Sequence, residues 1–97
     1  MIKIQIIGIR KPGGATNHHS AISHYKWRDE SGQVDIWDRM TMVNWIQQDP
    51  DNHKAYVTDR VGDVVYCRVV RNQFGTLFLE TRPDGILADN LLSLPLC

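Results

Sequence analysis

The chain has 97 residues, of which 42% are hydrophobic and 23% charged, and its 11 basic and 11 acidic side chains give a formal net charge of zero. This length suits one domain, residues 1–97, with one core, and the composition is typical of a folded globular chain. A zero net charge excludes a global basic field that would attract nucleic acid or an anionic membrane, and no apolar run is long enough to span a bilayer.

The first predicted element is a strand over residues 2–10, IKIQIIGIR. Strict alternation would place Ile4 and Ile6 on one face and Ile7 and Ile9 on the other, which predicts a central position in a sheet. Because this apolar segment lacks a small-residue cleavage site, we interpret it as a strand and not as a signal peptide.

A second hairpin strand is predicted after a Gly- and Pro-containing loop at residues 11–20. Residues 21–29, AISHYKWRD, would place Tyr25 and Trp27 on one face, and residues 30–33 would form a turn.

A helix is predicted over residues 38–48, after a short extended lead-in at 34–37. Asp38 is the expected N-cap, because its carboxylate can accept hydrogen bonds from amides of the first turn. Pro50 cannot continue the helix and ends it. The face expected to pack on the core carries apolar residues at helical spacing, namely Met42, Val43 and Ile46.

Three further strands are predicted as a meander, over residues 54–59, 64–71 and 76–81, with Asn, Asp and Gly in the turns between them. The order ββαβββ predicts an α+β domain. It has a mostly antiparallel sheet, one helix packed on one face and an ordered C-terminal tail.

The two cysteines, Cys67 and Cys97, indicate a reducing compartment. A single bridge to the last residue is a weak framework, so we expect thiols and a cytoplasmic location.

Histidines are the first candidates for chemistry, because imidazole nitrogens bind metals. His18, His19 and His24 lie close in sequence, but adjacent residues of an extended chain point in opposite directions. We therefore expect no metal and no cofactor, and interpret these histidines as candidate binding residues. A small metal-dependent hydrolase, combining them with Asp84, is an alternative hypothesis.

Nucleic-acid binding is a second alternative, because aromatic side chains flanked by cations can stack nucleobases. Tyr25, Trp27 and Arg28 would supply the aromatic and basic strand face, with Arg10 and Lys11 nearby. The zero net charge makes this hypothesis the less favoured one.

The tail after residue 81 contains a turn, a polar pair and a leucine-rich strip closed by proline. Proline stops the strand ladder, and Asp-Gly suits a tight turn. Leucines need burial, so we interpret the tail as a structural segment that closes the hydrophobic core. Its signature residues are Arg82, Pro83, Asp84, Gly85, Asp89, Asn90, Leu91, Leu92, Leu94 and Pro95.

Several segments together resemble a family of small bacterial proteins catalogued as domain of unknown function 3892. The matching pieces are I-x-I-x-x-I-R-K at 4–11, H-x-A-I-S-H-Y-K-W at 19–27, M-V-N-W-I at 42–46, A-Y-V at 55–57 and L-F-L-E-T-R-P-D-G…D-N-L-L-S-L-P at 77–95. The resemblance implies a compact single domain and supplies no catalytic residue.

The sequence contains no nucleophile elbow, phosphate-binding loop or dinucleotide fingerprint. We therefore predict a non-enzymatic binding or adaptor domain that acts through a protein partner, as a monomer or a homodimer and without a membrane. A counter-defence factor of a phage or mobile element is a further alternative, suggested by size alone.

Overall fold

The computed structural model describes residues 1–12, 21–58, 62–81 and 94–96. Within these residues the chain forms seven strands and one helix. They are β1 (Ile2–Arg10), β2 (His24–Asp29), β3 (Val34–Asp38), α1 (Arg39–Gln48), β4 (His53–Thr58), β5 (Val64–Tyr66), β6 (Arg68–Arg71) and β7 (Leu77–Glu80).

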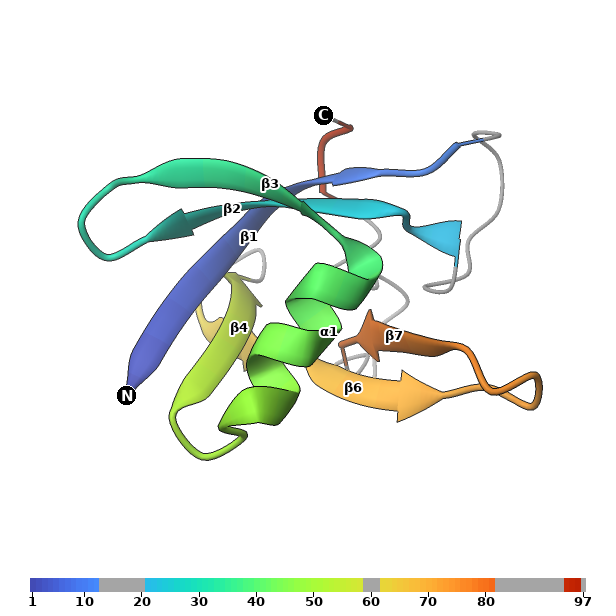
Figure 1. Cartoon of the computed structure of the whole chain (residues 1–97). Coiled ribbons are helices and arrows are strands. Elements are labelled where there is room, and N and C mark those ends of the chain that lie inside the picture. The colour runs from blue at the N-terminus through green and yellow to red at the C-terminus, as the bar shows by residue number, and fades with distance from the viewer. Residues whose placement is uncertain (13–20, 59–61, 82–93, 97) are drawn as a thin grey trace.

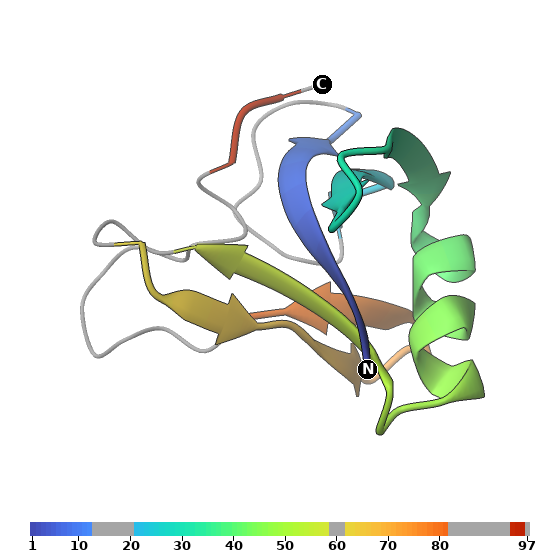
Figure 2. The same cartoon turned by 90° about the vertical axis from the view of Figure 1, so that its left-hand side faces the viewer.

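Five of the strands form one sheet in the order β3-β2-β1-β4-β5, and β6 pairs with β7 in a second sheet. The β1–β4 pairing is parallel and the others are antiparallel. Helix α1 lies against one side of the strands (Figures 1 and 2). The predicted α+β class, with a mostly antiparallel sheet and one helix, is confirmed, as is the central position of β1.

A β-bulge at Ile7 changes the faces predicted for β1. Ile6 lies opposite Trp27, whereas Gly8 lies opposite Lys26, so Ile7 is an extra residue in the ladder. One extra residue shifts the two-residue alternation by one position. Ile9 therefore returns to the face of Ile6, and both are buried. The prediction that Ile9 faces away from Ile6 was wrong because it assumed a regular strand.

Helix α1 begins and ends where the sequence predicts. The Asp38 carboxylate accepts a hydrogen bond from the amide of Thr41 at 2.7 Å, which confirms it as the N-cap. Met42 and Val43 are buried, and Ile46 packs at the edge of the same core. The helix thereby covers the inner face of the sheet and also contacts β7.

Three tryptophans link α1 to the sheet. The ring of Trp37 lies between those of Trp27 and Trp45, with centroid distances of 4.7 and 5.8 Å. His53 stacks on Trp45 at 4.3 Å and bonds through Nδ1 to the Trp45 carbonyl at 2.6 Å. A carbonyl only accepts hydrogen bonds, so Nδ1 carries the proton. Trp45 therefore packs at the edge of the core.

Two predicted segments differ from the structure. Residues 34–37 are part of an edge strand, β3, and not only a lead-in to the helix. Residues 64–71 form two strands, because the chain passes from one sheet to the other at Cys67, whose amide donates to the Ala55 carbonyl at 2.9 Å. The alternation of Val65, Cys67 and Val69 toward the core continues across this break, so the sequence pattern alone does not reveal it.

The described part of the C-terminal tail, residues 94–96, lies beside β1. The amide of Ile9 donates to the Pro95 carbonyl at 3.0 Å, and Ile9 and Leu96 form a parallel bridge. Leu94 packs against the core, as the structural interpretation of the tail predicts, whereas Leu96 is exposed in the single chain. The signature residues from Arg82 to Leu92 lie outside the described residues.

Candidate binding face of the sheet

The two predicted aromatic ligands of β2 point into the core. Tyr25 is 0% and Trp27 6% exposed, so neither ring can stack on a nucleobase at the surface. The Tyr25 hydroxyl accepts a hydrogen bond from the amide of Leu79 at 3.4 Å, and burial raises the pKa of Tyr25. The prediction that Tyr25 and Trp27 form a binding face together with Arg28 was wrong, because alternation along β2 places the aromatic and basic side chains on opposite faces.

The cations of the sheet gather on its outer face. Residues opposite one another in a ladder share a face, so the pairing of Arg10 with His24 and of Gln5 with Arg28 places all four outward. The outward positions include five cations, Lys3, Arg10, Lys26, Arg28 and Lys54, which we call the cationic face. The described outward positions of β1, β2, β4 and β5 contain no carboxylate.

Lys26 lies near the centre of the cationic face. It is opposite Gly8 on β1 and Ile36 on β3. Glycine has no side chain, so no side chain of β1 lies directly opposite Lys26. Arg28 is held nearby, because its guanidinium donates to Gln5 Oε1 at 3.1 Å.

Tyrosines extend the cationic face at its other end. Tyr56 and Tyr66 lie opposite each other on β4 and β5, and their rings meet edge to face at 6.5 Å. Lys3 Nζ lies 6.0 Å from the centroid of the Tyr66 ring, within the range of a cation–π contact. Tyr66 is 47% exposed, so an aromatic surface borders the cations.

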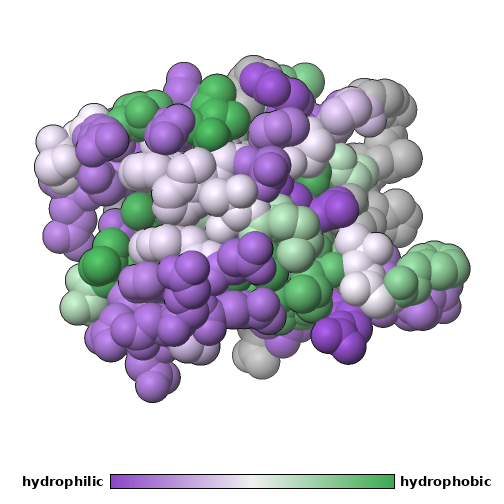
Figure 3. Space-filling view, viewed as in Figure 1, coloured by the Kyte–Doolittle hydropathy of each residue, from purple (hydrophilic) through white to green (hydrophobic). Residues whose placement is uncertain are grey.

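Aliphatic side chains flank the cationic face at both outer strands. Val34 and Ile36 of β3 point outward beside Arg28 and Lys26, and Val64 of β5 points outward opposite Thr58. All three are exposed. The face therefore offers positive charge in the middle and apolar area at both sides. On the side of the molecule that carries α1, hydrophilic, neutral and hydrophobic residues are intermixed (Figure 3).

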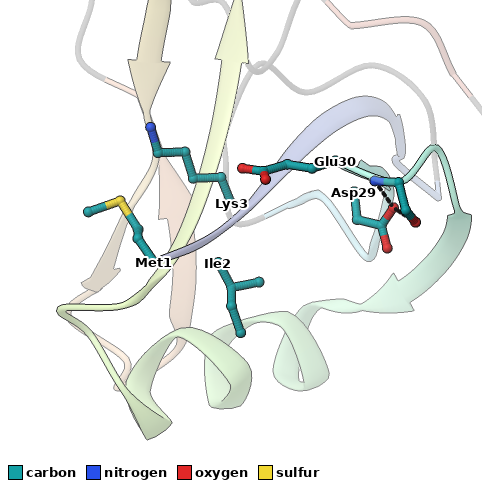
Figure 4. Close-up of a pocket in the computed structure, with 6 residues that line it drawn as sticks. Met1, Ile2, Lys3, Asp29 and Glu30 are labelled. Atoms are coloured by element: carbon teal, nitrogen blue, oxygen red, sulfur yellow. Dashed lines mark hydrogen bonds between the residues drawn. The ribbon is translucent and has the colours of Figure 1, made fainter.

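A depression of about 220 Å³ lies at the amino-terminal end of β1, between Met1, Lys3 and the turn at residues 29–31. Lys3 and Glu30 lie on the same side of β1 there, whereas Ile2 points toward α1 (Figure 4).

The Asp29 carboxylate is already occupied by this turn. It accepts from the Ser31 hydroxyl and from the amides of Ser31 and Gln33. These hydrogen bonds, the Ser31 hydroxyl first, lower the pKa of Asp29. Asp29 therefore stabilises the turn.

Ser23, His24 and Asp38 form the nearest approach to a nucleophile with a base. Ser23 Oγ lies 2.8 Å from His24 Nδ1 and donates to the Arg10 carbonyl at 3.2 Å. The Ser23 hydroxyl has one proton, which goes either to the Arg10 carbonyl or to His24 Nδ1, depending on the histidine tautomer. The Asp38 carboxylate caps α1. A depression of about 270 Å³ adjoins this arrangement.

The other predicted site residues are distributed as follows. Arg10 is exposed and Lys11 half-buried at the end of β1, while His24 is half-buried on the outer face. His18, His19 and Asp84 lie outside the described residues, so the hydrolase hypothesis stays a prediction. Within the described residues, no group of three potential metal ligands lies together. In the same residues, no helix has the length and apolar character needed to cross a membrane.

Sequence reasoning missed Lys3, Lys54, Tyr56 and Tyr66. Lys3 of β1 is far in the sequence from the other three, and the four residues meet because β1 pairs with β4, and β4 with β5. The available signal was the alternation K-A-Y-V-T at 54–58, in which Ala55 and Val57 are buried.

The fold and its surface define the class of this protein as a small α+β domain with a curved sheet, one covering helix and a cationic outer face. The model of a family described as "Protein of unknown function (DUF3892)" matches residues 5–95, and the chain belongs to this family. No curated protein and no solved structure matches the chain.

Proposed function

We propose that this chain is a non-catalytic binding domain that acts in the cytoplasm and docks a protein partner on the cationic face. The observation that carries the proposal is the segregation of charge. A chain with zero net charge has five outward cations on one face of its sheet, and no outward carboxylate on four of the five strands that make it. Such a local field favours an acidic partner and speeds its association.

The exposed aliphatic residues favour a protein over other anions. Val34, Ile36 and Val64, at the two sides of the cationic face, give exposed apolar area that a protein partner can bury. A phosphate backbone would leave these side chains without matching contacts. The expected partner surface therefore combines carboxylates with aliphatic side chains.

A charge-reversal pair tests the proposal. Lys26→Glu places a carboxylate at the centre of the cationic face, whereas Arg71→Glu makes the same charge change on exposed β6. Proteins retained from a native lysate by the immobilised wild-type chain should be retained by Arg71→Glu and lost, by about tenfold or more, with Lys26→Glu. Such a loss corresponds to at least about 1.4 kcal/mol of binding free energy. Equal retention by both variants would exclude the cationic face as the docking surface.

Single-stranded nucleic acid is a second candidate, favoured by the exposed Tyr66 ring beside Lys3. Aromatic stacking next to cations is the usual basis of such binding, which weakens steeply with salt. Titration of the chain with oligothymidylate at low salt distinguishes the candidates. A salt-sensitive signal that Tyr66→Ala abolishes would support this candidate, and no signal would exclude it.

A further inference from the structure

Strand β3 forms one edge of the five-stranded sheet, and among the described residues its one strand neighbour is β2. The backbone hydrogen bonds at the two ends of the β2–β3 pairing determine which residues of β3 bond to β2. Asp29 N donates to the Gln33 carbonyl, and Arg39 N donates to the Ser23 carbonyl, both at 2.9 Å.

Hydrogen-bonded positions alternate along an antiparallel ladder. Between positions 33 and 39 they therefore fall on Asp35 and Trp37, whose backbone groups point to β2. The amides and carbonyls of Val34 and Ile36, and the amide of Asp38, consequently point to the outer edge of the sheet. Such an edge is a template for pairing with another strand.

The central donor of this edge is already occupied by the chain itself. Asp35 Oδ1 accepts a hydrogen bond from the Ile36 amide at 2.7 Å. An incoming strand would have to displace the carboxylate from Ile36 before it could bond there. Asp35 and Asp38 also place negative charge along the edge, and charged side chains on edge strands oppose strand addition.

The edge is self-complementary when two copies run antiparallel about Ile36. Ile36 would lie opposite Ile36 of the second copy, so that each Ile36 amide faces an Ile36 carbonyl. Val34 would lie opposite Asp38, and the Asp38 amide would face the Val34 carbonyl. Val34 and Ile36 are 45% and 40% exposed, so this pairing would also bury apolar area. In the same arrangement, Asp35 would lie opposite Trp37 of the second copy.

We propose that the β3 edge is a pairing surface for a second copy of this chain, and that the Asp35 side chain keeps it closed. Asp35 acts mainly by occupying the Ile36 amide, and its charge adds repulsion between copies. The wild-type chain is accordingly monomeric in isolation. Its outer edge becomes available when this side-chain acceptor is removed.

The test compares Asp35→Ala with Asp35→Asn, because asparagine retains an acceptor oxygen and loses only the charge. Sedimentation equilibrium should give the mass of one chain for the wild type and Asp35→Asn, and of two chains for Asp35→Ala. Asp51→Ala removes the same charge from an exposed turn and should stay monomeric. Asp35→Val provides a second dimerising variant if the alanine variant folds poorly.

A second substitution identifies the dimer interface. Adding Ile36→Lys to Asp35→Ala should restore the monomer, because two lysines would face each other at the centre of the pair. The proposal is overturned if Asp35→Ala and Asp35→Val are both monomeric, or if the wild type is already dimeric. It is also overturned if Asp35→Asn dimerises as strongly as these two variants, or if adding Ile36→Lys leaves the dimer intact.

Discussion

Tyr25 connects the two sheets of this small domain through a single hydroxyl. It belongs to β2, and its oxygen accepts from the amide of Leu79 on β7. The hydroxyl is buried with the core, which raises the pKa of Tyr25, because ionisation would place a charge in an apolar environment. A residue that looks like a surface ligand in sequence therefore has a structural role.

The raised pKa of Tyr25 predicts loss of stability at alkaline pH. A tyrosine in the unfolded chain ionises near pH 10, whereas the folded chain keeps Tyr25 neutral above that pH. Below about pH 10 the neutral hydroxyl contributes its full share to the free energy of unfolding. This contribution declines as the pH rises from there toward the pKa of Tyr25 in the folded chain.

Tyr25→Phe should test this pH dependence. At neutral pH it leaves the Leu79 amide without its acceptor and should lower the free energy of unfolding by about 1–3 kcal/mol. Denaturant titrations should show the difference from wild type narrowing above about pH 10, because phenylalanine cannot ionise. If the difference in free energy of unfolding between the two chains stays constant up to the highest pH at which both fold, the burial of Tyr25 is contradicted.

At the scale of elements, side-chain oxygens determine where the helix begins and where the chain turns between strands. Asp38 ends β3 and caps α1, and Asn72 Oδ1 accepts from the amides of Phe74 and Thr76 in the β6–β7 turn. Gly75 completes this turn with a φ of 81°, a conformation that favours glycine. These short-range contacts explain why the helix start and the hairpin turn follow from sequence.

The cap at Asp38 predicts an acid-sensitive helix. Hydrogen bonds from Thr41, its hydroxyl before its amide, lower the pKa of Asp38, and His24 lowers it further. The stabilisation is therefore present above the unfolded pKa, about 3.9, and is lost as the pH falls through the lower folded value. Asp38→Ala should lower the midpoint temperature of thermal unfolding and remove this acid dependence. Asp38→Asn should have a midpoint temperature close to that of the wild type. Equal midpoints for alanine and wild type in calorimetry would refute the cap.

At the scale of the whole molecule, the fold separates an apolar interior from a cationic exterior on the two faces of one sheet. The bulge at Ile7 is central to this separation, because without it Ile9 would face outward and Arg10 inward. The pairing of β1 with β4 then brings Lys3 beside Lys54, and Gln5 beside Tyr56. The resulting face is a property of the assembled sheet and of no single segment.

Local chemistry was predictable from the sequence, and long-range pairing was not. The N-cap at Asp38, the end of the helix near Pro50 and the strand at residues 2–10 follow from residues within a few positions of one another. The parallel pairing of Ile2 with His53 joins segments 51 residues apart, and no local period encodes it.

The same limit applies to the candidate site. Arg10 and Arg28 were predicted as basic binding residues, and the structure places both on the cationic face. Tyr25 and Trp27 were assigned to the same surface because the buried face of β2 cannot be distinguished before its neighbours are known. Only the sheet shows which residues of each strand point outward.

Lysine footprinting tests the central claim, that the cationic face is the docking surface, most directly. The chain is acylated briefly in buffer and in native lysate, and the modification of each lysine is measured by peptide mass spectrometry. The account predicts that Lys3, Lys26 and Lys54 react more slowly in lysate, while Lys11, at the end of β1, reacts equally in both. Unchanged reactivity of Lys3, Lys26 and Lys54 would contradict it.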